Sequence, residues 1–339
     1  MRDMFEETVE RLLAQELTPE VLVRAEAGQW PGALWSAVEE NGLPLAAVSE
    51  ARGGVGGSWH DAFVLIQAAG RHGAPGLLAE TIAVNWLLDQ VGLDPVAGPA
   101  TLAIFEGGAR EGRFSGDLRD VPWLESSGHV LIATGGELLL FAPPQATGRS
   151  LNIAREPRAT ARLEDAEPVC RAPLGALPDD IILLAGAMIR SAQIAGGLSR
   201  LLAMAVDYAN QRVQFGRSIG KFQSVQHQIA LLAEHMTLAS ATAETAFASA
   251  SAELSPFAVA AAKSVASEAA GQGAAIAHAV LGAIGFTYEH SLHFTTRRLW
   301  AWRSEFGGQT YWATRIGEGV CRAGSGAFWP RLVAGRVAV

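Results

Sequence analysis

The sequence predicts an α+β fold that is mainly helical, with helices at both ends of the chain and a small β region between them. Three observations support this prediction. Apolar residues recur at helical spacing over residues 1–97, short β-type runs separated by glycine and proline occupy residues 98–177, and long alanine-rich stretches fill residues 178–339. We therefore expect an N-terminal helical domain, a small middle β domain and a C-terminal helical bundle with these bounds.

Composition narrows the class of protein. The chain has 339 residues, of which 49 % are hydrophobic and 18 % charged, which is typical of a packed globular protein of two or three domains. The net charge of -8 argues against nucleic acid as a partner. Two cysteines are too few for a disulfide framework, which indicates a cytoplasmic protein. The apolar run from Ile181 to Ile189 is cut by Arg190, short of the ~20 residues of a membrane span, so we expect none.

Each region has its own local signals. In the N-terminal region, apolar-periodic stretches at residues 61–69 and 77–91 predict helices. In the middle region, residues 129–134 and 137–141 read as two strands, and the Gly135-Gly136 dipeptide between them predicts a hairpin. The C-terminal region predicts three long helices, over Ile181 to about Gln211, about Ser224 to Ala252, and Pro256 to about Gly282.

The segment from Arg212 to His227 joins the first two of these long helices. It brings a cation, two glycines and several amides into one loop. An arginine there can fork onto a diphosphate, and free backbone N–H groups can add to the site. Composition alone would equally allow an ordinary helical hairpin with a surface arginine.

The exact letters of this segment resemble the signature of the acyl-CoA dehydrogenases: Arg, any residue, Gln-Phe-Gly, then Ile, then Phe-Gln. In that family the Arg reaches the FAD diphosphate of a neighbouring subunit, and the Phe and Gln line the adenosine end. The resemblance therefore implies FAD as cofactor. The implied contacts are Arg212, Gln214, Phe215, Ile219, Phe222 and Gln223.

A second segment, Leu281 to His290, resembles the family's Gly-Gly-X-Gly-Phe run, which approaches the flavin diphosphate from the other subunit. By position, Gly282, Ala283 and Gly285 would contact the cofactor. The chain departs from the pattern at Ala283, where a second Gly is usual, and at Ala279, where a Gln is usual. The continuation from Glu289 to Arg298 resembles the branch that acts on bulky CoA thioesters such as steroid side chains.

The middle region departs most from the family pattern. Residues 105–110 run almost directly into residues 114–122, where full-length members carry a loop around the flavin ring. We expect this loop to be missing or heavily shortened. The N-terminal region keeps the order and spacing of the family's first helical domain, and its glycine-rich loop at residues 53–58 lacks the preceding strand that a dinucleotide fingerprint needs.

Oxidation of a saturated thioester needs a base for the Cα proton and an acceptor for the Cβ hydride. The family supplies a Glu base from one of two places. One falls at Gly186-Ala187, where no carboxylate stands, and the other falls one residue after Glu305. Glu305 is therefore the candidate catalytic residue, although a surface Glu at a turn would look the same. His290 and His293 have no third ligand at a credible spacing, so no metal site is expected.

The resemblance implies an FAD-dependent acyl-CoA dehydrogenase, an oxidoreductase acting on an acyl-CoA with an electron-transfer flavoprotein or similar acceptor. It would work as a homo-oligomer, or as a heterotetramer with a paralogous dehydrogenase subunit. Two alternatives stay open. In the first, the chain is a non-catalytic or base-lacking subunit of a heteromeric acyl-CoA dehydrogenase. In the second, it is a scaffold or assembly protein that kept the fold without flavin chemistry.

Overall fold

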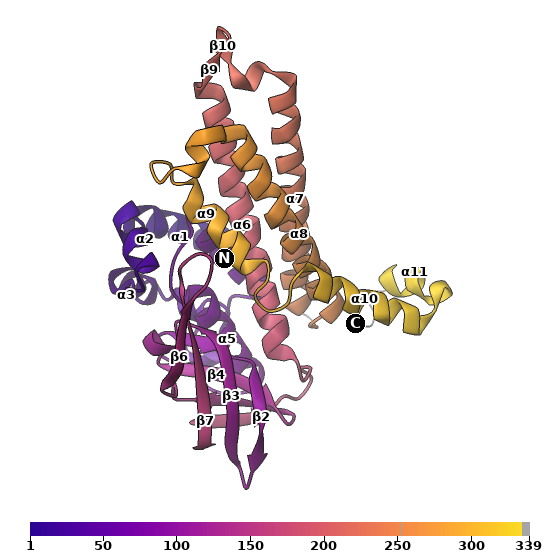
Figure 1. Ribbon diagram of the computed structural model, residues 1–339. Coiled ribbons are helices and arrows are strands. Elements are labelled where there is room, and N and C mark those ends of the chain that lie inside the picture. The colour runs from indigo at the N-terminus through magenta and orange to yellow at the C-terminus, as the bar shows by residue number, and fades with distance from the viewer. Residues whose placement is uncertain (252, 334–339) are drawn as a thin grey trace. The chain divides into compact units, whose positions relative to one another are not determined.

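The computed structural model describes residues 1–251 and 253–333. By compactness the chain divides into two units, the first made of residues 1–65 and 74–189 and the second of residues 66–73 and those from 190 onward. Helices occupy both ends of the sequence and strands the middle, so the predicted fold class is confirmed (Figure 1). The three-domain division at residues 97 and 177 stays a prediction.

The first unit begins with helices joined by short breaks. Their bounds are α1 Arg2–Glu16, α2 Pro19–Glu26, α3 Gly32–Glu40, α4 Trp59–His72 and α5 Leu78–Gln90, with 3-10 turns η1 Leu43–Leu45 and η2 Glu50–Arg52. The last turns of α4 belong to the second unit. The indole rings of Trp59 and Trp86 stack with centroids 4.5 Å apart, which joins α4 to α5.

Two four-stranded sheets follow in the same unit. One has the order β1-β4-β5-β8, and the other has the order β2-β3-β7-β6. The strands are β1 Ala100–Leu102, β2 Phe105–Arg110, β3 Arg113–Pro122, β4 His129–Thr134, β5 Glu137–Phe141, β6 Ala146–Leu151, β7 Pro157–Ala166 and β8 Cys170–Pro173, with a 3-10 turn η3 Leu124–Ser126. One apolar cluster combines side chains of both sheets, including Phe114 and Leu118 of β3 and Val130 and Ile132 of β4. The sheets therefore enclose a shared core.

The predicted hairpin at Gly135-Gly136 is confirmed. Thr134 pairs with Glu137, and the two glycines between them have φ values of 61° and 76°. A two-residue turn with both φ values positive matches the twist of the strands, and glycine adopts it without steric cost.

The second unit is helical. Its elements are the part of α6 (Ile181–Gln211) from Arg190 onward, α7 Gln223–Ala250, α8 Pro256–Leu281, α9 Leu292–Trp302, α10 Gln309–Ala323 and α11 Ser325–Val333, with short strands β9 Val213–Gln214 and β10 Arg217–Ser218 and 3-10 turns η4 Ile219–Lys221 and η5 Gly282–Phe286. The three long helices lie nearly at their predicted bounds. Figure 1 shows them side by side, with β9 and β10 connecting α6 to α7 at one end.

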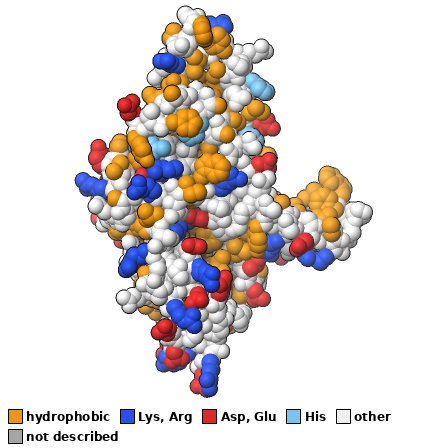
Figure 2. All heavy atoms as spheres, in the orientation of Figure 1, with side chains coloured by type: hydrophobic (Ala, Val, Ile, Leu, Met, Phe, Trp, Pro, Cys, Tyr) orange, Lys and Arg blue, Asp and Glu red, His pale blue; other side chains and the backbone are white. Residues whose placement is uncertain are grey.

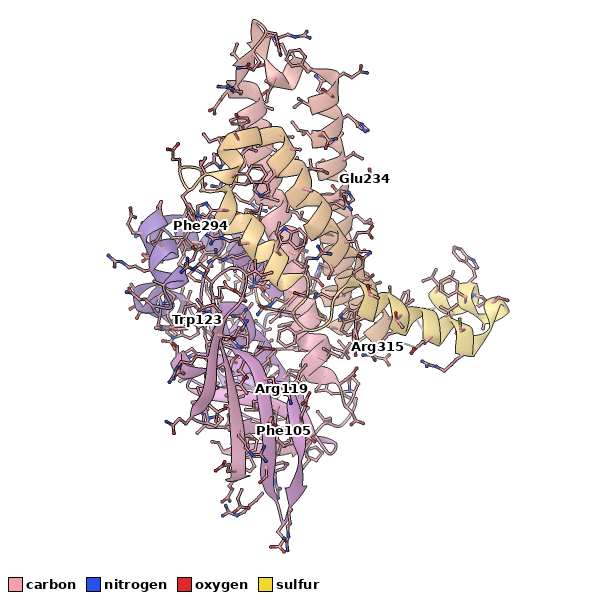
Figure 3. All side chains as sticks on the ribbon, viewed as in Figure 1. Phe105, Arg119, Trp123, Glu234, Phe294 and Arg315 are labelled. Carbon is pink, nitrogen blue, oxygen red and sulfur yellow. The ribbon has the colours of Figure 1, made fainter. Side chains whose placement is uncertain are left out.

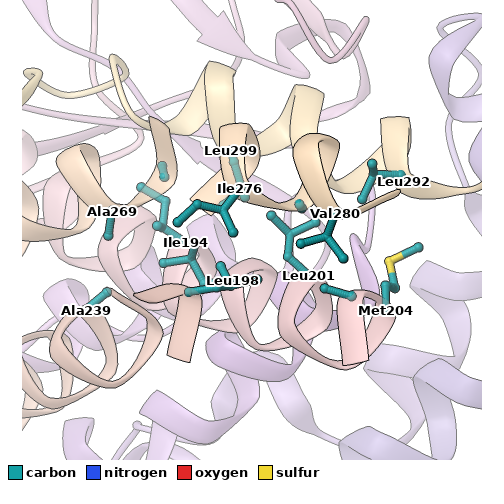
Figure 4. Packing of buried hydrophobic residues seen from close by; sticks show 14 of the residues in the cluster. Ile194, Leu198, Leu201, Met204, Ala239, Ala269, Ile276, Val280, Leu292 and Leu299 are labelled. Atoms are coloured by element: carbon teal, nitrogen blue, oxygen red, sulfur yellow. The ribbon is translucent and has the colours of Figure 1, made fainter. Parts of the chain in front are cut away.

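The helices of this unit share a buried apolar cluster, and they pack most closely where small residues lie. Leu198 and Leu201 of α6, Ile276 of α8 and Leu299 of α9 share one buried cluster (Figure 4). A Cβ added at Gly196 would overlap the carbonyl oxygen of Gln67, so the last turns of α4 touch the backbone of α6 directly. Such contacts leave no room for larger side chains.

Two helical runs of the described residues are long and apolar enough to cross a membrane. The apolar window of α6 is 94 % buried inside the protein, as in a core helix, and that of residues 256–286 is 44 % buried. The exposed face of the second run includes the hollow described below.

Candidate functional site

A two-residue hairpin presents the first predicted segment. Gln214 pairs with Arg217, and the turn between them consists of Phe215 and Gly216, with φ values of 52° and 77°. Such a turn favours glycine, and a phenylalanine there is held out into solvent. Phe215 is 91 % exposed, so this end of the unit presents an apolar side chain to solvent.

Arg212 lies at the base of this hairpin. Its carbonyl oxygen accepts a hydrogen bond from the N–H of Ile219, which closes the loop. The guanidinium is exposed and makes no hydrogen bond or ion pair with any described residue. An exposed, unpaired arginine is available to an anionic ligand from outside the chain.

The other predicted residues of the segment surround that arginine. Phe222 packs edge-on against Phe215 at 6.1 Å, and the guanidinium of Arg217 covers the Phe222 ring at 4.2 Å. Gln214 and Gln223 are exposed, while Ile219 packs on the core cluster of the unit. The segment therefore combines a cation, amides and aromatic rings on one accessible surface.

The second predicted segment follows α8. Gly282 ends the helix with φ 64° and ψ -141°, a conformation that only glycine adopts readily. Gly282 and Ala283 are exposed and Gly285 is buried. The ring of Phe286 stacks on the ring of His278 at 4.6 Å, and it is otherwise 75 % exposed.

Gly282, Ala283, His278 and Phe286 help to line an open hollow of about 640 Å³ on α8, η5 and α9. The rest of its lining consists of small side chains of α8 and the indole of Trp300. The Nδ1 atom of His278 is buried and has no hydrogen-bond partner among the described residues. Burial also lowers the pKa of this imidazole. The hollow therefore offers small and aromatic side chains to a ligand.

The two predicted cofactor segments are not brought together within one chain. Among the described residues, no hydrogen bond or ring contact joins the hairpin of Arg212 to Gly282, Ala283 or Gly285. Each segment is accessible from outside. Figure 2 shows apolar side chains on the surface at the end of the helical unit where Figure 1 places β9 and β10.

Glu305 lies in a turn between α9 and α10, and it is paired. The Nε of Arg190 donates to its Oε2 at 2.7 Å, and the Nη1 of Arg190 donates to Gln193 at 2.6 Å. The side chain of Arg190 is 2 % exposed and that of Glu305 is 18 % exposed. The turn also places the ring of Phe306 beside the guanidinium, at 5.7 Å. The carboxylate is thus held in place by a buried guanidinium.

A buried lysine stands behind this turn. Lys263 of α8 is fully buried, and its Nζ donates to Ser267 and to the carbonyl oxygens of Arg303 and Gly307. The pKa of Lys263 is lowered from the ordinary 10.5 to about 7, mainly by burial; Glu305 raises it, and Arg190 and Arg303 lower it. Arg190, Lys263 and Glu305 thus form one buried charged cluster.

Sequence reasoning missed the two cations of this cluster. Arg190 interrupts the apolar start of α6, and Lys263 stands in the alanine-rich α8, so both were visible as charges in apolar helices. A charged residue at such a position is rarely buried without a partner. The sequence does not indicate that the partner is Glu305.

In the first unit, a tight hairpin occupies the stretch where the flavin-ring loop is expected to be short. Strands β2 and β3 are joined by Glu111 and Gly112 alone, with φ values of 54° and 79°. Arg119, labelled in Figure 3, forms an ion pair with Glu106 across these strands at 3.3 Å. No additional loop leaves the sheet between residues 105 and 122.

Comparison with known families matches both helical ends of the chain. Residues 2–94 match the model "Acyl-CoA dehydrogenase, N-terminal domain", and residues 183–316 match "Acyl-CoA dehydrogenase, C-terminal domain". Among curated proteins, the acyl-CoA dehydrogenase IpdE2 of Mycobacterium tuberculosis is 32 % identical over 313 residues, which cover 88 % of this chain and 90 % of that protein.

Solved structures show the same fold at lower identity. A variant of the Tcur3481-Tcur3483 steroid ACAD has a TM-score of 0.82 and 22 % identity, covering 94 % of this chain and 96 % of that chain. The ChsE4-ChsE5 complex from Mycobacterium tuberculosis has a TM-score of 0.83 and 20 % identity, covering 94 % and 97 % respectively.

Proposed function

The chain belongs to the acyl-CoA dehydrogenase family, and from that premise we propose that it catalyses FAD-dependent α,β-dehydrogenation of a bulky acyl-CoA thioester. The observation that carries the proposal is the unpaired, exposed guanidinium of Arg212 beside the exposed ring of Phe215. A diphosphate would neutralise the arginine, and a planar base would cover the phenylalanine.

The residues present fit a flavin dinucleotide. Arg212 would hold the diphosphate, while Gln214, Phe222 and Gln223 would line its adenosine end, with Ile219 supporting them. On a second chain, Gly282, Ala283 and Gly285 would allow the backbone to approach the cofactor closely. Ala279 and Ala283 leave the hollow wide, and Ala279 removes the polar contact that a glutamine would make. We therefore expect this chain to bind FAD more weakly than a chain with the usual motif.

Two groups carry the chemistry. Bound FAD supplies the acceptor for the hydride that leaves Cβ of the substrate. Glu305 would take the Cα proton. A carboxylate must be ionised before it can accept a proton, and the adjacent guanidinium of Arg190 favours the ionised form.

The acyl group is proposed to be bulky, of the steroid side-chain type. The residues from Glu289 to Arg298 resemble that branch of the family, and one similar structure is described as a steroid ACAD. An electron-transfer flavoprotein or a similar acceptor would reoxidise the enzyme. We place the reaction in the cytoplasm, which suits a chain whose Cys170 and Cys321 are both free thiols.

The site is proposed to be shared between subunits. The two cofactor segments are both accessible and are not joined in one chain, which suits a ligand held across a subunit contact. One observation favours a paralogous partner over a second copy: the β2–β3 hairpin leaves no loop to surround the flavin ring. In that second candidate function, the partner supplies the loop, or the base, or both.

The visible spectrum tests the proposal. The protein is purified alone and again after coexpression with a paralogous acyl-CoA dehydrogenase, and the flavin absorbance is compared with the protein concentration. Octanoyl-CoA and a steroid side-chain CoA thioester are then added, and bleaching of the flavin bands is followed. About one flavin per subunit in the lone protein argues against the heteromer, and no flavin in either preparation contradicts the proposed function.

A further inference from the structure

The Nζ atom of Lys263 donates hydrogen bonds to three acceptors in the protein interior, out of contact with water. Its side chain is fully buried in α8. The Nζ atom lies 3.1 Å from Ser267 Oγ, 3.0 Å from the carbonyl oxygen of Arg303 and 2.8 Å from that of Gly307. An ammonium group has three N–H donors, so donors and acceptors match one to one.

The two carbonyl groups flank Glu305 on either side along the chain. Ser267 reinforces the first by donating its own hydroxyl to the oxygen of Arg303 at 2.9 Å. On the other side, Phe306 and Gly307 have φ values of 52° and 87°, so the backbone turns sharply there. The indole Nε1 of Trp312 donates to the carbonyl oxygen of Phe306 at 3.0 Å.

The turn is therefore held at its backbone by α8 and α10, and at its carboxylate by α6. Arg190 provides the last of these contacts through the 2.7 Å bond to Oε2. A Cβ on Gly307 would lie 2.6 Å from Nε1 of Trp312, so the turn packs closely against α10. Among the described residues, Lys263 is the one side chain that binds the backbone on both sides of Glu305.

We propose that Lys263 is a positioning residue for catalysis: it fixes the turn from Arg303 to Gly307 so that the Glu305 carboxylate is presented in one place. This inference rests on the proposed function, in which Glu305 is the base. A base acts only within hydrogen-bond reach of the proton it abstracts, and a misplacement of about 1 Å costs roughly a hundredfold in rate. The hydrogen bonds from Lys263 to the turn go to backbone carbonyl groups, so it positions the carboxylate by holding the backbone, while its charge also acts on Glu305.

The test compares three variants of the holoenzyme, in the oligomer that binds flavin, with the CoA thioester that bleaches the wild-type flavin fastest. Lys263→Met removes the ammonium and keeps an apolar side chain. Glu305→Gln removes the base. Leu232→Ala is the matched control, because it creates a cavity in the core cluster of the same unit without touching the turn.

Stopped-flow spectroscopy gives the rate constant of flavin reduction and the dissociation constant of the thioester separately. For Lys263→Met we expect the rate constant to fall about a hundredfold, with flavin content unchanged and the dissociation constant within about threefold. Leu232→Ala should lose stability and keep a rate constant within about twofold of wild type. If Lys263 served stability alone, the rate constant of flavin reduction would be unchanged in both Lys263→Met and Leu232→Ala, or it would fall equally in both.

Each other outcome is decisive. If Lys263→Met reduces flavin at the wild-type rate, or if Leu232→Ala slows it as much, the inference is overturned while the proposed function stands. If Glu305→Gln retains the wild-type rate, the proposed base and this inference both fail. Should Lys263→Met not fold, Ser267→Ala takes its place. It weakens the same carbonyl contact, and we expect a smaller loss in the rate constant with unchanged thioester binding. An unchanged rate constant in that variant overturns the inference.

Discussion

Arg190 and Glu305, which lie 115 residues apart in the sequence, form a hydrogen-bonded ion pair of 2.7 Å inside the helical unit. The arginine is almost fully buried and donates a further bond to Gln193. A guanidinium at this depth needs a carboxylate, and a carboxylate proposed as a base needs a neighbour that favours its ionised form. The pair therefore ties the proposed chemistry to the stability of the unit.

Arg190→Met should destabilise the protein, because Glu305 and Gln193 lose their buried partner. We expect a loss of about 3–5 kcal/mol in the free energy of unfolding, the range found when one member of a buried pair is removed. Denaturant titration measures it. The control is Arg322→Met, which removes a surface arginine paired with Glu318 at 3.9 Å and should change stability by less than about 1 kcal/mol. Equal losses in both variants would contradict the role assigned to Arg190.

Glu305→Gln should abolish turnover and leave the bound flavin in place. Gln keeps the shape of the side chain and still accepts a hydrogen bond from Arg190, but it cannot take a proton. Loss of a positioned general base costs about 10²–10⁴-fold in rate. Steady-state turnover and the flavin spectrum of the same sample check both halves of the prediction, and surviving activity would move the base to a partner subunit.

Arg212→Ala should weaken FAD binding with the fold preserved. The guanidinium contacts no other described side chain, so its removal leaves no unpaired group behind. A charge-assisted hydrogen bond contributes about 1.5–3 kcal/mol, which corresponds to roughly a ten- to 150-fold rise in the dissociation constant. Flavin titration into apoprotein measures it, with circular dichroism for the fold. Arg322→Ala is the control, and flavin binding unchanged in Arg212→Ala would refute the cofactor assignment.

Gly196→Ala should destabilise the helical unit. A methyl group there meets the carbonyl oxygen of Gln67 and forces α4 and α6 apart. Overpacking of this kind costs about 1–3 kcal/mol. Gly317→Ala in α10 is the matched control, because nothing lies within 4 Å of the added methyl group and alanine favours helix. In thermal unfolding, we expect the melting temperature to fall in Gly196→Ala and to rise in Gly317→Ala.

Lys263 should make stability rise with pH above neutrality. Burial lowers its pKa to about 7 from an ordinary 10.5. Between these values the unfolded chain holds a proton that the folded chain has lost, so the contribution of this lysine to the free energy of unfolding increases from about pH 7 to about pH 10.5. Lys263→Met should lack this increase when the two proteins are unfolded in parallel at several pH values.

The same lysine can be observed directly. The chain contains two lysines, Lys221 and Lys263, and Lys221 is exposed. Carbon-13 labelling at Cε therefore gives two NMR signals, one of which serves as an internal control. We expect the Lys263 signal to titrate near its lowered pKa of about 7, well below the ordinary range of a lysine. Coincident titrations would contradict the burial of Lys263.

The local structure was predictable because its signals are local. Apolar periodicity located α6, α7 and α8 nearly at their observed bounds, and the Gly135-Gly136 dipeptide identified its hairpin. The letters from Arg212 to Gln223 identified the family, since a site that recognises a diphosphate depends on particular side chains at fixed spacing. The short connection between β2 and β3 was also predictable, because the sequence lacks the residues that form the flavin-ring loop in full-length family members.

The environment of each candidate site residue was decided by the tertiary structure. Glu305 was singled out by counting along the chain, but its pairing with Arg190 and its support by Lys263 depend on how α6 and α8 pack around the turn. Periodicity states which face of a helix is buried and does not state what that face meets. The sequence by itself determined the family and the main elements, and it singled out Arg212 as the proposed ligand of the cofactor diphosphate. Only the folded chain decided which charges meet, because burial forces each charge to find a partner and the partner lies far away in sequence.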